Sequence, residues 1–128
     1  MVKLTDQAKA LLDGRNFGCV ATVMPDGSPQ VAPVWVERDE DQVLISATES
    51  RQRTRNIRRD PRVALAVFDM QNPYRKVMIR GKVVEITKDG AEAQIDRLSM
   101  KYQGKKYAYH QADDPRVVIR IRPERVTH

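Results

Sequence analysis

The sequence predicts a mostly antiparallel β-barrel with short helices, folded as one domain over residues 1–128. Hydrophobic residues make up 41% of the chain but aromatic residues only 5%, so the core must consist mainly of Val, Ile, Leu and Ala, which favours strands. The expected elements follow the order helix, three strands, helix, two strands, helix, strand. This order lacks the regular strand and helix alternation of a doubly wound parallel sheet. No internal repeat or low-complexity linker divides the chain.

The first part of the chain predicts a helix followed by three meandering strands. Thr5 is a suitable N-cap for the helix, and Gly14 is placed to end it. The expected strands cover residues 17–24, 30–37 and 42–47. Residues 25–28, with the sequence Pro-Asp-Gly-Ser, are typical of the turn of a hairpin between the first two strands. Residues 38–41 are expected to form the loop before the third strand.

The second part predicts two helices and three further strands. A helix that begins at Ser50 ends near Arg59, because Pro61 disfavours helical geometry in the residue before it. The expected strands cover residues 63–69, 75–87 and 117–122, a loop covers residues 70–74, and the third helix covers residues 88–101. Gly81 lies in the middle of the long strand. The last strand alternates apolar and basic residues, as expected when one face is buried.

Charge and composition restrict the possible chemistry. The net charge of +6 and the pI near 9.7 predict affinity for an anion: nucleic acid, a phosphorylated metabolite or a polyanionic cofactor. Cys19 is the only cysteine, which excludes an intrachain disulfide and a cysteine-rich metal site. The two histidines, His110 and His128, do not support a metal cluster or a Ser-His-Asp arrangement. An enzyme with this sequence would therefore depend on a bound cofactor for its chemistry.

Two classes of large partner are disfavoured. No stretch approaches the roughly 20 apolar residues of a membrane span, and residues 1–12 lack the apolar run of a signal peptide, so we expect a cytoplasmic protein without membrane contact. A nucleic-acid-binding barrel would explain the charge. However, no strand interleaves aromatic and basic residues into a stacking platform, so we expect no nucleic-acid partner.

Residues 50–59, with the sequence SRQRTRNIRR, are the most informative segment. A helix that begins at Ser50 offers unpaired N–H groups, a hydroxyl and the positive end of the helix dipole, which together form an anion site. Helical spacing places Arg53 on the same face as Ile57, so its guanidinium points toward the core and needs a partner such as a ligand phosphate. The residues expected to anchor the phosphate are Arg51, Arg53 and Thr54. The arginines expected to be solvated are Arg55, Arg58 and Arg59.

Three other segments are candidates for ligand contacts, each with a structural alternative. Pro33 removes one ladder hydrogen bond from its strand, so neighbouring backbone groups are free to bind the polar edge of a planar ring such as an isoalloxazine. Trp35, the only tryptophan, packs either in the core or against the ligand. Residues 72–75 form either a binding loop or a simple turn. An aromatic cluster after the third helix forms either a lid over a substrate or an amphipathic surface loop: Tyr102, Tyr107, Tyr109 and His110.

In their order and spacing, several segments together resemble the pyridoxamine 5′-phosphate oxidase-like split β-barrel proteins. These are ATV (21–23), DGSP (26–29), PVWV (33–36), RTRNIRRDPRV (53–63), NPYR (72–75), IRG (79–81) and DPRVVI (114–119). The resemblance covers nearly the whole chain and is strongest to the flavin/deazaflavin-dependent oxidoreductases of that superfamily. It implies the FMN-binding split barrel as the fold.

The resemblance also implies a homodimer with two cofactor sites at the subunit interface. The turn from Ser50 to Thr54, with Arg51 and Arg53, would hold the phosphate. The ring system would lie against Pro33, Val34, Trp35, Ala47 and Thr48. The other subunit would contribute Asn72, Pro73 and Tyr74.

Coenzyme F420 is the expected cofactor. Its phosphodiester and oligoglutamate tail suit a chain of net charge +6, and FMN is the alternative. The chain lacks the C-terminal substrate-binding pattern of pyridoxamine phosphate oxidases proper, so vitamin B6 oxidation is not expected. The implied reaction is hydride transfer to a small organic acceptor such as an enone or imine, with a proton from solvent or a tyrosine. The sequence singles out no catalytic residue, and a non-catalytic cofactor-binding protein stays an alternative.

Overall fold

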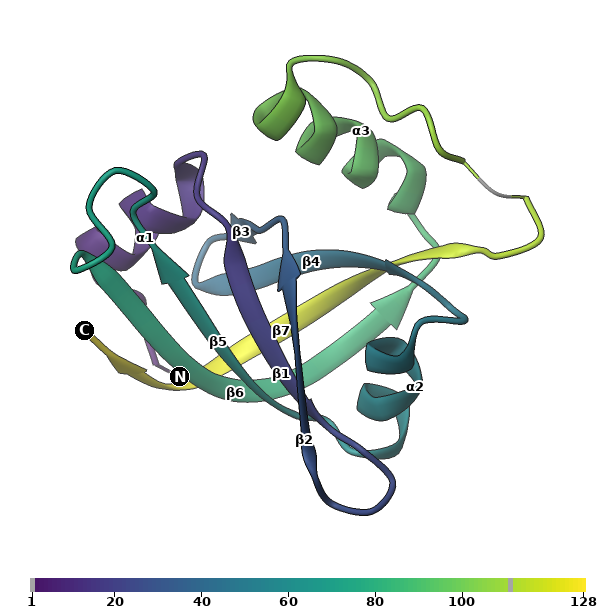
Figure 1. The fold of residues 1–128 in the computed structure, drawn as a ribbon, viewed down its shortest axis with the longest axis horizontal. Coiled ribbons are helices and arrows are strands. Elements are labelled where there is room, and N and C mark those ends of the chain that lie inside the picture. The colour runs from purple at the N-terminus through teal and green to yellow at the C-terminus, as the bar shows by residue number, and fades with distance from the viewer. Residues whose placement is uncertain (1, 111) are drawn as a thin grey trace.

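The computed structural model describes residues 2–110 and 112–128, which form seven strands and three helices (Figure 1). The helices are α1 (Asp6–Asp13), α2 (Gln52–Arg59) and α3 (Ala91–Gln103). The strands are β1 (Gly18–Val23), β2 (Pro29–Val34), β3 (Glu37–Asp39), β4 (Gln42–Thr48), β5 (Arg62–Phe68), β6 (Lys76–Thr87) and β7 (Arg116–Thr127). This confirms the prediction of a mainly β chain with short helices.

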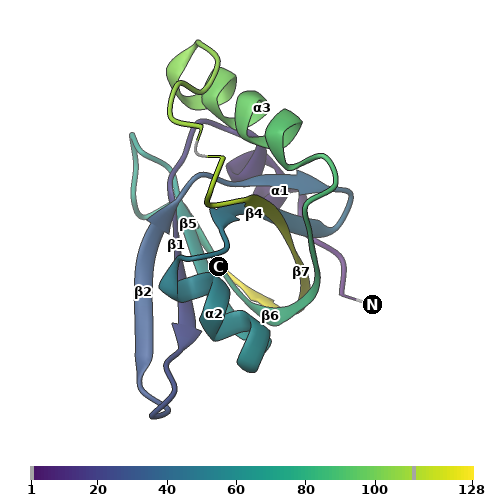
Figure 2. The ribbon, with the colours of Figure 1, turned by 90° about the vertical axis from the view of Figure 1, so that its right-hand side faces the viewer.

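The strands form one antiparallel sheet in the order β2-β1-β5-β6-β7-β4-β3. The sheet curls into a barrel, with α2 across one opening and α3 outside β4 and β7 (Figure 2). The end strands β2 and β3 do not pair with each other in the described chain, so the barrel stays open on that side. This split, antiparallel barrel is the predicted fold.

One apolar core fills the barrel and consists almost entirely of aliphatic side chains, as the composition predicts. Its largest fully buried members include Leu11, Leu12, Val20, Val36, Val43, Val67, Val77, Ile79, Ile119 and Ile121. The helix α1 contributes Leu11 and Leu12, because they lie three and four residues after Ala8 and so share its buried face. None of the helices in the described ranges is long and apolar enough to cross a membrane.

Several predicted boundaries are confirmed, and others are corrected. Thr5 caps α1 through its hydroxyl, which accepts a hydrogen bond from the Ala8 N–H at 3.0 Å, and Gly14 follows the helix. The second helix begins at Gln52 rather than at Ser50, because the N–H and hydroxyl of Ser50 both donate to the carboxylate of Asp114.

The sheet also differs from the predicted strands. The second predicted strand ends early, at Val34, and a short strand, β3, takes up part of the loop predicted at residues 38–41. The last strand continues to Thr127. Pro123 does not end β7, because it lies opposite Gly81 at a register shift where a ladder N–H is not required. The third helix begins at Ala91, three residues later than predicted, because residues 88–90 form a turn closed by Ala91 N–H to the carbonyl of Lys88.

The C-terminal turn of α3 fixes the wall of the site described below. The Nζ atom of Lys101 donates to the carbonyl oxygens of Leu12 (2.6 Å) and Val36 (2.7 Å). The hydroxyl of Tyr102 accepts from the Val36 N–H at 3.1 Å and donates to the Asn16 carbonyl at 2.6 Å. These contacts join α3 to the end of α1 and to the connection between β2 and β3, on which Trp35 lies.

Candidate functional site

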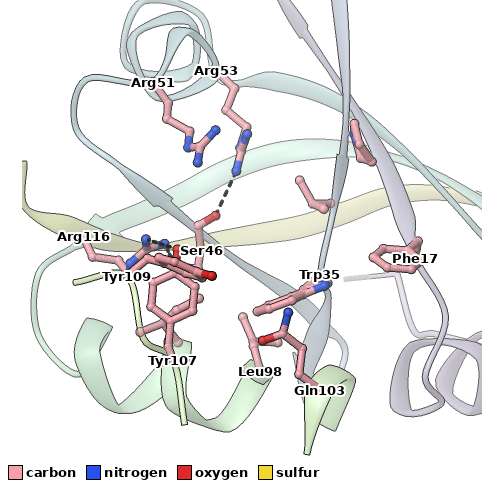
Figure 3. A pocket seen from close by; sticks show the side chains of 13 residues that line it. Phe17, Trp35, Ser46, Arg51, Arg53, Leu98, Gln103, Tyr107, Tyr109 and Arg116 are labelled. Atoms are coloured by element: carbon pink, nitrogen blue, oxygen red, sulfur yellow. Dashed lines mark hydrogen bonds between the residues drawn. The ribbon is translucent and has the colours of Figure 1, made fainter. Parts of the chain in front are cut away.

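A pocket of about 370 Å³ lies between the end of β2, the middle of β4, the start of α2 and the inner side of α3 (Figure 3). The segment after α3 and the start of β7 complete it. Its lining residues are Phe17, Pro33, Val34, Trp35, Ser46, Arg51, Arg53, Ile95, Leu98, Gln103, Tyr107, Tyr109 and Arg116.

One end of the pocket is strongly basic. Arg51 and Arg53 extend from the start of α2, and Arg116 extends from the start of β7 toward the same region (Figure 3). No carboxylate among the described residues lies within 4.0 Å of any of these three guanidinium groups. Unpaired cations gathered in a partly buried pocket are typical of an anion-binding site.

Arg53 is the most constrained of the three. Its Nη2 atom donates to the Ser46 carbonyl oxygen at 3.2 Å, whereas its Nε atom is buried without a partner in the described structure. Burial, together with the charges of Arg51 and Arg116, lowers the pKa of Arg53 to about 10. A ligand phosphate would accept the unused N–H and offset these like charges.

Buried polar contacts fix the direction in which α2 presents Arg53. The Thr54 hydroxyl donates to the Thr48 carbonyl at 2.7 Å, which holds the first turn of the helix against β4. The fully buried Asn56 amide donates to the Thr22 hydroxyl at 2.9 Å and so joins the helix to β1. Sequence reasoning missed Asn56, because an asparagine within a basic helix gives no signal of burial.

The other end of the pocket is a flat aromatic wall. The rings of Trp35 and Tyr102 stack with centroids 5.3 Å apart and an interplanar angle of 5°. Tyr107 meets Trp35 edge-on, with centroids 6.5 Å apart. Trp35 is half-buried: one part of it packs on the buried Tyr102, and it also lines the pocket. Such a wall suits a planar ring.

The structure brings part of the predicted site together. Five of the predicted residues line the pocket: Pro33, Val34, Trp35, Arg51 and Arg53. Ala47 and Thr48 lie buried in β4, directly after the pocket residue Ser46. The hydroxyl of Ser50 is bound to Asp114 at 2.5 Å.

Ala47, Thr48 and Ser50 are not among the lining residues of the pocket, and neither are the other four predicted residues. Thr54 is fully buried, and its hydroxyl is engaged by β4 rather than exposed to a ligand. Asn72, Pro73 and Tyr74 lie in the exposed connection between β5 and β6, where Tyr74 is 90% exposed, on the side of the molecule near α1 (Figure 1). Within one chain, this loop and the pocket are separate.

Sequence reasoning gave no role to Ser46 or Arg116. Arg116 lies in the DPRVVI segment, but nothing in that segment indicates that β7 pairs with β4 and brings the two residues together. The aromatic segment after α3 does line the pocket, through Tyr107 and Tyr109. His110 holds this segment to α3, since its Nδ1 atom lies 2.5 Å from the Glu92 carboxylate.

Comparison with known proteins gives the same architecture. The family model for pyridoxamine 5′-phosphate oxidase matches residues 4–128. The chain belongs to this family. A solved structure named F420 reductase is 35% identical to the chain, with a TM-score of 0.86 over 97% of this chain and 98% of that one.

More distant structures share the fold. A conserved hypothetical protein from Mycobacterium tuberculosis is 21% identical, with a TM-score of 0.76 over 98% of this chain and 84% of that one. General Stress Protein 26 from Bacillus anthracis is 17% identical, with a TM-score of 0.72 over 94% of this chain and 89% of that one.

Membership of the pyridoxamine 5′-phosphate oxidase family supports an oxidoreductase with a flavin-type cofactor. The residues of the pocket fit such a group. The unpartnered Nε atom of Arg53 and the convergent guanidinium groups suit a phosphate, and the flat wall formed with Trp35 suits a ring.

Proposed function

We propose that the chain is a coenzyme F420-dependent oxidoreductase that transfers a hydride to a small organic acceptor. One observation carries this proposal: a single pocket holds guanidinium groups without carboxylate partners at one end and a flat aromatic wall at the other. The 35% identity to a protein named F420 reductase supports the deazaflavin as the cofactor. When bound, the reduced deazaflavin supplies the hydride.

The residues of the chain have separate roles in this proposal. Arg51 and Arg53 hold the phosphodiester, where a charge-assisted, bidentate contact fixes the cofactor in one register. Pro33 and Trp35 orient the ring. Tyr107 and Tyr109 cover the pocket, exclude water and are phenols able to donate a proton to the reduced acceptor; solvent is the other proton source.

The choice between coenzyme F420 and FMN is tested by the salt dependence of binding. The oligoglutamate tail adds carboxylates that FMN lacks, and exposed contacts to these carboxylates are screened within a Debye length of about 8 Å at physiological ionic strength. We expect tighter binding of F420 than of FMN at low salt, and a smaller difference at high salt. Dissociation constants measured by titration under both conditions check this. Tighter FMN binding under both conditions would make FMN the cofactor.

We also propose that two copies of the chain form the complete site. Two cross-strand rows make the outer face of β2, β1 and β5 apolar: Pro33, Cys19 and Ala66, and Val31, Ala21 and Ala64. On β6 the first row ends at Met78 and the second at Arg80. Val31 is 68% exposed and Met78 37% exposed on this face. An exposed apolar sheet face next to the edge strand β2 favours association. Because Pro33 also lines the pocket, the partner chain would lie beside the cofactor.

Light scattering at micromolar concentration tests this assembly. We expect a mass of twice the 14.7 kDa of one chain, and a shift to one chain for Val31→Glu, since a buried carboxylate opposes the contact. Met100→Glu, an equivalent change at an exposed apolar residue on α3, should leave the dimer intact. A wild-type protein that is monomeric under these conditions would contradict the shared site.

A further inference from the structure

Ser46 contacts two of the three unpaired arginines of the pocket at once. Its carbonyl oxygen accepts from the Nη2 atom of Arg53 at 3.2 Å, and its hydroxyl accepts from the Nη1 atom of Arg116 at 3.1 Å. Figure 3 shows these two side chains approaching Ser46 from different elements, α2 and β7. One neutral residue therefore contacts two like charges, and the charge of Arg116 still lowers the pKa of Arg53.

Arg116 is held in a defined orientation by neutral groups only. Its Nη2 atom donates to the Tyr107 hydroxyl at 3.3 Å, and its guanidinium carbon lies 4.8 Å from the centroid of the Tyr107 ring. A guanidinium packed on an aromatic face keeps its donor edge free for a planar acceptor. The neighbouring carboxylate of Asp114 is engaged by the Ser50 N–H and hydroxyl.

The number of charges indicates more than one anionic group. A phosphodiester carries a single negative charge, and Arg51 and Arg53 at the start of α2 suffice to hold it. Arg116 then stays half-buried and uncompensated on the other wall of the pocket, a costly arrangement without a further anion.

We propose that Arg116, with the hydroxyls of Ser46 and Tyr107, forms a second anion subsite that binds a carboxylate. The two oxygens of a carboxylate match the fork of a guanidinium, and hydroxyls are able to donate to the same group. The inference rests on the proposed function, in which α2 holds the phosphate. The carboxylate comes either from the tail of the cofactor or from a separate molecule such as the acceptor.

Trp35, the only tryptophan, lines the pocket, so its fluorescence reports binding without any turnover. In the first arm, Arg116→Gln is titrated with coenzyme F420 and with FMN, which carries a phosphate and no carboxylate. If the tail supplies the carboxylate, the affinity for F420 falls about tenfold while that for FMN changes less than twofold.

In the second arm, succinate is titrated into FMN-loaded protein. If a separate molecule supplies the carboxylate, succinate binds to the wild type and at least about tenfold more weakly to Arg116→Gln.

Controls separate charge, fold and phosphate effects. Arg122→Gln removes the same charge from a half-exposed position on β7, where Arg122 pairs with Glu124 at 3.7 Å outside the pocket, and should change the affinities measured in neither arm. Arg116→Lys keeps the positive charge but lacks the two parallel N–H donors of a guanidinium. It should recover part of the affinity for the carboxylate ligand even if Arg116→Gln proves unstable. Equal losses for F420 and FMN in Arg116→Gln, or no change in either arm, would overturn the second subsite. If the proposed phosphate anchor itself is wrong, the result is different: Arg53→Ala would then leave the affinities for F420 and FMN unchanged.

Discussion

Replacing Arg53 with alanine is expected to weaken the binding of both F420 and FMN by about ten- to a hundredfold. A charge-assisted hydrogen bond contributes about 1.5 to 3 kcal/mol, and Arg53 has a buried N–H that only a ligand would engage. The fold should be retained, because the variant removes a buried charge that lacks an anionic partner in the described protein. Titration by Trp35 fluorescence and a thermal unfolding curve of the free protein measure the two effects separately.

Arg55→Ala is the matched control for this prediction. Arg55 lies two residues later on the same helix and is exposed, and among the described hydrogen bonds its side chain donates only to the Gln52 side chain, at 2.6 Å. Its replacement should change cofactor affinity by less than about twofold. Equal losses in the two variants would indicate that the basic helix acts only through diffuse charge, which is the behaviour expected of a nucleic-acid-binding surface.

Gly81→Ala is expected to destabilise the protein by about 3 kcal/mol. A Cβ atom at Gly81 would overlap the carbonyl oxygen of Arg122 and lie 3.0 Å from its carbonyl carbon and 3.2 Å from the Cα atom of Pro123. All three atoms belong to the backbone of β7, so no side-chain rotation relieves the overlap. Urea unfolding followed by Trp35 fluorescence gives the free energy of unfolding.

Gly14→Ala provides the comparison, because it makes the same chemical change in a different environment. Its closest contact is 2.8 Å to Nδ2 of Asn16, which donates to the Leu11 carbonyl at 3.0 Å, and the next is 3.2 Å to the Ala10 carbonyl oxygen. The change therefore costs about one hydrogen bond rather than a backbone overlap. We expect a loss of about 1 kcal/mol or less. A loss at Gly81 no larger than the loss at Gly14 would show that β6 and β7 separate locally without cost.

The elements that local sequence chemistry specifies were predictable. The Thr5 cap, the Asp26-Gly27 turn and the stop at Pro61 each depend on a few neighbouring residues, and the structure has a helix start, a hairpin and a helix end there. The sequence places Gly81 in the middle of a strand, and the register between β6 and β7 shifts there. The extent of β7 was not predictable, because Pro123 is tolerated only where Gly81 faces it.

Local sequence spacing also identified some of the residues that line the pocket, but not those placed by contacts between distant segments. Arg53 was identified because helical spacing alone directs it toward the core side. Asn56 and Ser46 were not identified, since their roles depend on Thr22 and Arg116, which are distant in sequence. Contacts of this kind arise from strand pairing, and strand pairing has no local signature.

The pairing of β4 with β7 has a consequence for how the protein folds. It aligns residues 43–48 with residues 116–121, so it closes a loop of about seventy residues, and such long-range closures are slow steps. The same step carries Arg116 to Ser46. An intermediate that lacks β7 therefore has Arg51 and Arg53 at the pocket but not Arg116. A ligand that contacts both α2 and β7 would bind the closed barrel alone and so raise its free energy of unfolding.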